Sequence, residues 1–147
     1  MIGLRLETGT LDEIRDIKRV LECEMKDLRK GYVRYSLHKT DADDVHVMVM
    51  LLRQRCSITP HCSTRKGNNF YMVLEGMLEV SEIDLTISER KVNILTEQSA
   101  PLVVDRTNWR ILTNNGAAPC LYLEITNGPF RQRQTSWNWI YDLGNSG

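Results

Sequence analysis

Two residues that lie far apart in the sequence have side chains suited to binding or chemistry. His61 follows Pro60, and because an imidazole titrates near neutrality, His61 could serve as a general acid or base. Arg110 could hold a carboxylate or a phosphate through two parallel hydrogen bonds. Each has a simpler interpretation: His61 could be a surface corner at a strand end, and Arg110 could form a salt bridge with an acidic neighbour. The sequence alone leaves these interpretations open.

Several further side chains could take part in a site. Tyr71 and Trp109 could stack on a sugar or another ring, although aromatic residues more often fill a core. His46 shares strand parity with the apolar residues around it, which favours a structural histidine over a binding one. Cys62 stands beside His61, but adjacent residues of a strand point to opposite faces. We therefore do not expect a catalytic Cys–His pair.

The composition argues against several classes of protein. The 147 residues suit one domain, and 19 basic residues balance 19 acidic ones, so the formal net charge is zero. Without a basic face we expect no nucleic-acid partner, and without an apolar run of about 20 residues we expect no membrane partner. The N-terminus lacks the pattern of a signal peptide, and the four cysteines form no C-x-x-C pair. We therefore expect a cytoplasmic protein with reduced thiols.

The elements that must position the candidate residues begin with one amphipathic helix. Apolar residues recur at helical spacing between residues 11 and 30, and Gly31 supplies a stop signal. We expect the apolar stripe of this helix to pack against a sheet.

From Tyr32 onward the pattern is that of short strands separated by turns. Segment 45–52 is apolar on both faces, as in a strand buried between two layers. Turn-forming runs such as Asn114-Asn115-Gly116 separate the segments. Many short strands after one helix predict a β-sandwich or barrel in a single domain. The predicted strands cover residues 33–37, 45–52, 70–74, 78–83, 92–95, 102–104, 109–113 and 121–125.

An aromatic tail, residues 131–147, follows the predicted domain, which we place at residues 1–130. The tail includes Trp137, Trp139 and Tyr141, and aromatic residues at this density are rarely exposed. We expect the tail to pack on its own domain; the alternative is that it crosses to a second subunit. We also expect a homodimer, to which the apolar segment 45–52 could contribute.

Two stretches of the sequence resemble the paired motifs of the cupin family. Residues 57–61 followed by 71–76 are similar to the first motif, G-x5-H-x-H-x3-4-E-x6-G. Residues 105–110 followed by Asn114 are similar to the second, G-x5-P-x-G-x2-H-x3-N. The order of elements and the ending Glu124 to Phe130 resemble the WbuC-type cupins of bacterial surface-polysaccharide gene clusters. This resemblance, over residues 10 to 130, implies a mainly β, double-stranded β-helix (jelly-roll barrel) preceded by one helix.

The resemblance also shows which metal ligands this sequence lacks. A cupin site takes two histidines and a carboxylate from the first motif and one histidine from the second, and these hold a divalent metal. His61 occupies the first position, whereas the other three fall on Ser63, Asn69 and Arg110. Serine and a neutral amide are poor ligands for such a metal, and a guanidinium is a cation. We therefore expect no cofactor; a divalent metal at His61 is the alternative.

The resemblance and the residues together favour a small-molecule-binding cupin with a degenerate metal site. His61 and Tyr71 are the candidate catalytic residues, and Arg110 would anchor a small polar or anionic ligand. The gene context of the family suggests a sugar or sugar nucleotide, and an enzyme of this kind would be a metal-independent isomerase or epimerase. The alternatives are a non-catalytic dimeric scaffold or regulator and, as an outsider, a metal-dependent dioxygenase or isomerase. Further candidate ligand-binding residues are Asn69, Ser63, Trp109 and His46.

Overall fold

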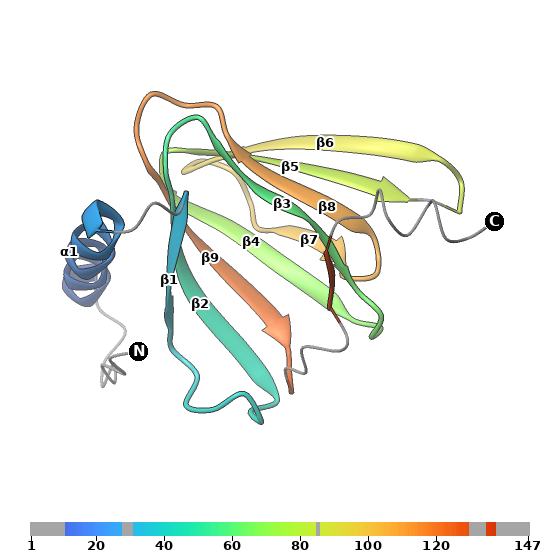
Figure 1. The fold of residues 1–147 in the computed structure, drawn as a ribbon, viewed down its shortest axis with the longest axis horizontal. Coiled ribbons are helices and arrows are strands. Elements are labelled where there is room, and N and C mark those ends of the chain that lie inside the picture. Colours follow the sequence, from blue (N-terminus) through green and yellow to red (C-terminus); the bar gives the residue numbers. More distant parts are fainter. Residues whose placement is uncertain (1–10, 28–30, 85, 130–134, 138–147) are drawn as a thin grey trace.

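One helix and two sheets make up the described part of the chain (Figure 1). The computed structural model describes residues 11–27, 31–84, 86–129 and 135–137. Helix α1 spans Leu11–Asp27, inside the predicted range of 11–30, of which residues 28–30 lie outside the described part. Ile17, Leu21 and Met25 are buried, and their spacing of four places them on one helix face. No helix in the described ranges is long and apolar enough to cross a membrane.

The two sheets face each other and each contains five strands. The first has the order β1-β2-β9-β4-β7 and the second the order β10-β3-β8-β5-β6. Neighbouring strands pair antiparallel, as in the β2–β9 and β3–β8 ladders. The predicted fold class, a mainly β double-stranded barrel preceded by one helix, is confirmed. The strands are β1 Tyr32–Ser36, β2 Val45–Leu52, β3 Cys56–Ser63, β4 Asn68–Glu75, β5 Met77–Asp84, β6 Glu89–Thr96, β7 Leu102–Asp105, β8 Trp109–Asn114, β9 Cys120–Asn127 and β10 Thr135–Trp137.

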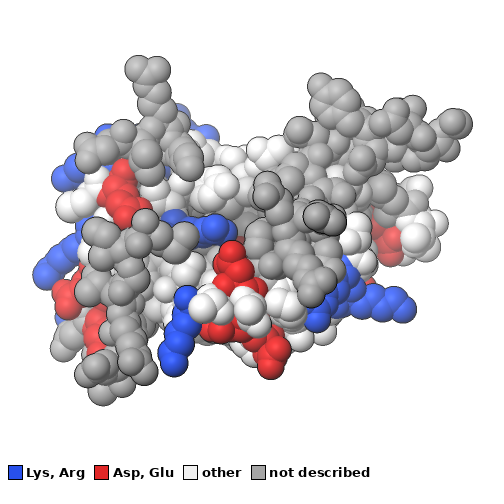
Figure 2. All heavy atoms as spheres, turned by 60° about the horizontal axis from the view of Figure 1, so that its bottom comes forward, with Lys and Arg blue, Asp and Glu red and all other residues white. Residues whose placement is uncertain are grey.

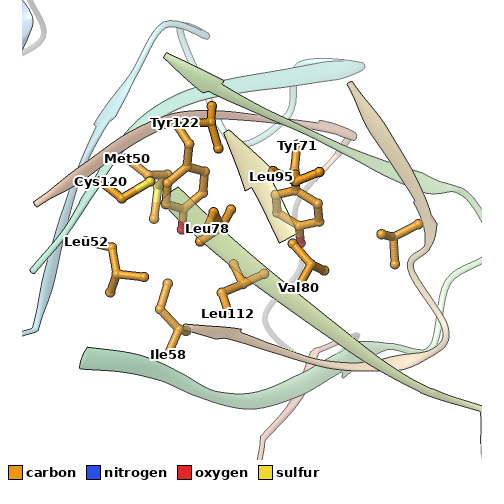
Figure 3. Packing of buried hydrophobic residues seen from close by; sticks show 12 residues of the cluster. Met50, Leu52, Ile58, Tyr71, Leu78, Val80, Leu95, Leu112, Cys120 and Tyr122 are labelled. Atoms are coloured by element: carbon orange, nitrogen blue, oxygen red, sulfur yellow. The ribbon is translucent and has the colours of Figure 1, made fainter. Parts of the chain in front are cut away.

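An apolar core fills most of the space between the sheets. Tyr71 from β4 and Tyr122 from β9 are fully buried in it, with ring centroids 6.4 Å apart. Figure 3 shows these two rings among aliphatic side chains of both sheets. Alternation along each strand explains the membership, because every second side chain of a strand points inward. The labelled aliphatic neighbours include Met50, Leu52, Ile58, Leu78, Val80, Leu95 and Leu112.

One end of the barrel is closed around Asn114, the last residue of β8. The side chain is fully buried, and its Nδ2 donates to the carbonyl oxygens of Leu52 at 3.1 Å and Ala118 at 2.9 Å. Its Oδ1 accepts a hydrogen bond of 2.9 Å from the backbone N–H of Gly116. The amide therefore ties β2, β8 and the β8–β9 turn together.

Helix α1 covers the outer face of the first sheet. Val49 and Leu51 of β2 pack outward in one cluster with Leu21 of the helix, whereas Met50 and Leu52 point into the barrel core. The prediction that segment 45–52 is buried between two layers is confirmed. Because its own chain covers both faces, this strand offers a second subunit little apolar surface beyond its first residue, Val45.

Part of the C-terminal tail returns to the second sheet. In β10, Thr135 pairs with Ser63 and Trp137 pairs with His61 through the antiparallel β10–β3 ladder. These three tail residues therefore lie on the domain of their own chain. Residues 130–134 and 138–147, with Trp139 and Tyr141, lie outside the described part.

Candidate functional site

A cavity of about 210 Å³ opens between the two sheets at the end of the barrel away from Asn114. It lies beside the loop from β1 to β2, at the bottom of Figure 1. Figure 2 turns this end forward and shows acidic side chains near the middle of the face, with lysines and arginines around them. Lys39 and Asp41 of the loop line the mouth. Of the seven site residues predicted from the sequence, five line the cavity: His46, His61, Ser63, Asn69 and Arg110.

The register of β3 with β8 places His61 opposite Arg110. These two residues are direct Cα partners, and the register shifts between Ile58 and His61. The irregularity lies before His61, and residues 61–63 pair with β10 in regular register. His61, Cys62 and Ser63 are all buried and all line the cavity. The expectation that adjacent Cys62 and His61 point to opposite faces of the strand stays a prediction.

Arg110 points into the barrel. Only 5% of the residue is exposed. Its Nε donates a hydrogen bond of 2.8 Å to the hydroxyl oxygen of Tyr71, and one terminal nitrogen donates at 3.1 Å to the carbonyl oxygen of Arg106. A charge buried in this way attracts an anion more strongly than an exposed one, because less water screens it.

Asn69 and Glu124 form the wall that faces Arg110. The Nδ2 of Asn69 donates to Glu124 Oε1 at 3.1 Å and to the hydroxyl oxygen of Tyr71 at 3.2 Å. Burial raises the pKa of the Glu124 carboxyl, although the charges of Arg110 and Arg34 act in the opposite direction. The Oδ1 of Asn69 is buried and accepts no hydrogen bond within the described part of the chain.

Arg34, Arg106 and Glu124 line the cavity but were not predicted as site residues. Glu124 lies two residues after Tyr122 of the core, so strand parity could have placed it inside the barrel. Arg106 follows β7 in a turn, where parity gives no signal; one terminal nitrogen donates at 2.7 Å to the carbonyl oxygen of Asn127. The Nε of Arg106 is buried without a hydrogen-bond partner in the described residues.

His61 is neutral over the physiological pH range. Burial, and then the charge of Arg110, lower its pKa to about 4. The expectation that it titrates near neutrality is therefore wrong for the ligand-free protein. Its Nδ1 lies 2.9 Å from the carbonyl oxygen of Thr59, and since a carbonyl only accepts, Nδ1 carries the proton and Nε2 the lone pair.

Tyr71 and Trp109 do not line the cavity. Tyr71 lies behind its wall, and burial raises the pKa of its hydroxyl to about 12, so the hydroxyl is neutral and accepts from Arg110 and Asn69. Trp109 precedes Arg110 in β8, and the alternation of the strand turns it to the opposite face. The structure therefore gives Tyr71 contact with the site only through its neighbours and does not bring Trp109 to it.

His46 lies at the mouth of the cavity in a stack with His38. The two ring centroids are 3.9 Å apart and the planes differ by 13°. The Nε2 of His46 lies 3.2 Å from the carbonyl oxygen of Asp41, and the Nδ1 of His38 lies 3.3 Å from that of Val47. Burial lowers the pKa of His46, and the neighbouring His38 lowers it further. The stack connects the β1–β2 loop to the start of β2.

The residues that the sequence resemblance places at the cupin ligand positions do not fit a divalent metal. Ser63, Asn69 and Arg110 join His61 in the same cavity, so the donor set contains one imidazole, two neutral polar groups and a cation. The Ser63 oxygen accepts a backbone hydrogen bond of 3.2 Å from Arg65. Among the described residues, no three His, Cys, Asp or Glu side chains are grouped to hold a metal ion.

The architecture of the chain matches solved structures at low sequence identity. The capsular polysaccharide assembling protein CapF from Staphylococcus aureus aligns with 75% of this chain at 18% identity and a TM-score of 0.64. A protein with a double-stranded β-helix domain from Klebsiella pneumoniae aligns with 75% of the chain at 14% identity and a TM-score of 0.58. The chain has the cupin fold. The cupin fold is a jelly roll of the kind that two facing five-stranded sheets form here.

Further comparisons give the same fold and no sequence relative. Oxalate oxidase in complex with the substrate analogue glycolate aligns with 81% of the chain at 13% identity and a TM-score of 0.62. The chain covers 32% of CapF, 61% of this oxalate oxidase and 86% of the Klebsiella protein. No model of a known protein family matches the sequence, and no curated protein matches it.

Proposed function

We propose that this cupin-fold chain binds a small anionic ligand, with the buried guanidinium of Arg110 in the place where a cupin metal ligand would stand. The observation that carries the proposal is the position of Arg110: it is buried, it faces the cavity, and it is the register partner of His61. A bound anion would neutralise this charge without any metal.

The other charges of the cavity support an anion. Arg34 and Arg106 join Arg110 in the lining, whereas Glu124 is the carboxylate inside and Asp41 lies at the mouth. Burial, and after it the charge of Arg110, lower the pKa of both Arg106 and His61, so the positive charge of Arg110 acts on both groups. An anion placed among them would relieve this repulsion.

A sugar or a sugar nucleotide is the ligand class that we propose within this frame. CapF, one of the similar structures, is a capsular polysaccharide assembling protein. In a metal-free reaction on such a ligand, neutral His61 would accept a proton at Nε2. A bound anion would also raise the pKa of His61, so the imidazole becomes a stronger base when the site is filled.

Calorimetric titration with inorganic phosphate and with glucuronate tests the proposal. We compare the wild type with Arg110→Met and Arg110→Lys, and use Arg19→Met, in the exposed part of α1, as the matched control. We expect Arg110→Met to weaken binding by roughly 10-fold to 100-fold, the effect of losing a charge-assisted bidentate contact. Arg110→Lys should restore part of the affinity, because the charge is retained but the fork is lost. Arg19→Met should bind like the wild type.

Two results would contradict the proposal. One is equal affinity of the wild type and a folded Arg110→Met variant for both anions. The other is a divalent metal at one equivalent per chain after purification without chelator, with anion binding lost when that metal is removed.

A further inference from the structure

The part of β3 that forms the cavity wall is also the part that pairs with the C-terminal tail. In the second sheet, β3 lies between β8 and β10. Residues 61–63 of β3 are buried and line the cavity, and the same residues are the register partners of β10. On the other side of the strand, His61 is the register partner of Arg110. The tail strand therefore adjoins the segment of β3 that the proposed ligand site uses.

Hydrogen bonds connect this segment to the guanidinium of Arg110. The backbone N–H of Ser63 donates at 2.8 Å to the carbonyl oxygen of Arg106. The same oxygen accepts a hydrogen bond of 3.1 Å from a terminal nitrogen of Arg110. A displacement of Ser63 would therefore move an acceptor that holds Arg110 in place.

The strand β10 is short, so its pairing with β3 is easily lost. It consists of residues 135–137 and lies at the edge of its sheet. Short segments at an edge open locally with free energies well below that of global unfolding. Opening of β10 would leave residues 61–63 without their register partners on that side.

From these contacts we infer that docking of β10 on β3 and binding of the anion are coupled, so that the tail strand regulates the affinity of the cavity. The inference rests on the anion-binding function proposed above and adds a regulation of the same site. Docked β10 positions residues 61–63, and through the Arg106 carbonyl oxygen it also positions Arg110. Linkage makes the coupling reciprocal: the factor by which detachment of β10 weakens anion binding is the factor by which a bound anion favours docking of β10.

A proline in the tail strand of the full chain tests the inference. Ser136→Pro removes one backbone N–H and restricts the residue before it, which disrupts so short a strand. Ser136→Ala and Trp137→Leu are the matched controls, because both keep the backbone groups that pair with β3. Calorimetric titration with inorganic phosphate measures the affinity of each variant, and the thermal midpoint shows whether it is folded. We expect Ser136→Pro to weaken phosphate binding by about fivefold to 150-fold, and both controls to stay within about threefold of the wild type.

Hydrogen exchange of the wild type provides the second readout. Saturating phosphate should slow exchange at the backbone amides of residues 135–137 by the same factor that Ser136→Pro removes from the affinity. The β5–β6 ladder at the other edge of the sheet is the internal control, and its exchange should not change. A strand that only stabilised the fold would exchange at the same rate with and without phosphate.

The outcomes separate this inference from the proposed function. Equal phosphate affinity of the wild type and a folded Ser136→Pro variant would overturn the coupling and leave anion binding intact. Unchanged exchange at residues 135–137 in the phosphate-bound wild type would do the same, whether or not the proline variant folds. An equal loss of affinity in Ser136→Ala or Trp137→Leu would also overturn the coupling, because a side chain and not the pairing would then be responsible.

Two further outcomes concern the anion site itself. A loss of affinity in Ser136→Pro, together with unchanged affinity in Arg110→Met, would overturn the proposed function alone. Absence of phosphate binding by the wild type at about 10 mM would overturn both proposals.

Discussion

Arg110 donates a hydrogen bond of 2.8 Å from Nε to the hydroxyl oxygen of Tyr71, whereas Tyr122, the other fully buried tyrosine of the described core, leaves its hydroxyl unpaired. The first hydroxyl holds a buried charge in place, since it also accepts from Asn69. The second has no hydrogen-bond partner among the described residues.

This contrast predicts opposite effects of the same substitution. Tyr71→Phe should lower the free energy of unfolding by about 1–3 kcal/mol and weaken phosphate binding, because Arg110 and Asn69 lose their shared acceptor. Tyr122→Phe should have little effect or stabilise the fold, because it removes a polar atom without a partner. Urea unfolding of both variants checks the pair, and an equal loss in both would contradict the assigned roles.

The pKa of His61 predicts a dependence of stability on pH. The folded-state pKa of about 4 lies below the ordinary histidine pKa of 6.5, so the unfolded chain binds the proton more tightly. The contribution is complete above about pH 6.5 and is lost as the pH falls toward 4. It amounts to on the order of 3 kcal/mol.

The difference in the free energy of unfolding between the wild type and His61→Gln separates the contribution of His61 from that of other titrating groups, including Glu124. Urea unfolding at several pH values should show the difference shrinking between pH 6.5 and 4. If the difference stays constant across this range, His61 does not have the depressed pKa.

Glu124 reduces the positive charge of the cavity, so Glu124→Gln should bind phosphate more tightly. At a separation of roughly 10 Å and an effective dielectric constant near 20, the repulsion between the carboxylate and a singly charged anion is about 1.7 kcal/mol. Removing it corresponds to more than tenfold in affinity. The amide can still accept from Asn69. Calorimetry at two salt concentrations measures the effect, with Glu79→Gln, half-buried and outside the cavity lining, as control. Unchanged affinity of Glu124→Gln would show that the carboxylate is already neutral.

At Gly128 there is no room for a side chain, because the β1–β2 loop and His46 lie against its backbone. Its backbone N–H donates at 2.7 Å to the carbonyl oxygen of Asp44, and an added Cβ would collide with the backbone of Asp43 and lie 2.8 Å from the ring of His46. Gly128→Ala should therefore cost about 1–3 kcal/mol and displace the β1–β2 loop. Gly31→Ala, where the new Cβ meets the side chain of Cys56 at 3.2 Å, should cost less. Thermal unfolding compares the two variants.

The fold could be predicted from the sequence because its signals are local and repeated. The helical spacing of Ile17 and Leu21 predicted a buried helix face, and the structure has one. The two-sided apolar pattern of residues 45–52 predicted a strand covered on both faces, which the structure also shows. The short strand 135–137 was not predicted, since three residues of backbone pairing with β3 leave no periodicity to detect.

The site could be predicted only in part. Two motif-like stretches placed His61 and Arg110 together, and the β3–β8 register pairs them. The register irregularity between Ile58 and His61 is a backbone property that residue types do not reveal. The low pKa of His61 depends on burial and on a charge 49 residues away in the chain. The position of the Arg106 side chain likewise depends on a hydrogen bond to the carbonyl oxygen of Asn127, a contact between distant residues that the sequence alone does not predict.

The hydrogen bonds of the Asn114 amide have a consequence for how a ligand enters and leaves the cavity. Among the described residues, the hydrogen bonds of Asn114 close that end and the core is packed behind it, so the cavity opens at the other end, beside the stacked rings of His38 and His46. Whatever enters there must leave by the same route, so an occupant has to depart before its successor can arrive. The rate at which one ligand replaces another should therefore equal the dissociation rate of the bound ligand and should not depend on the concentration of the competing ligand.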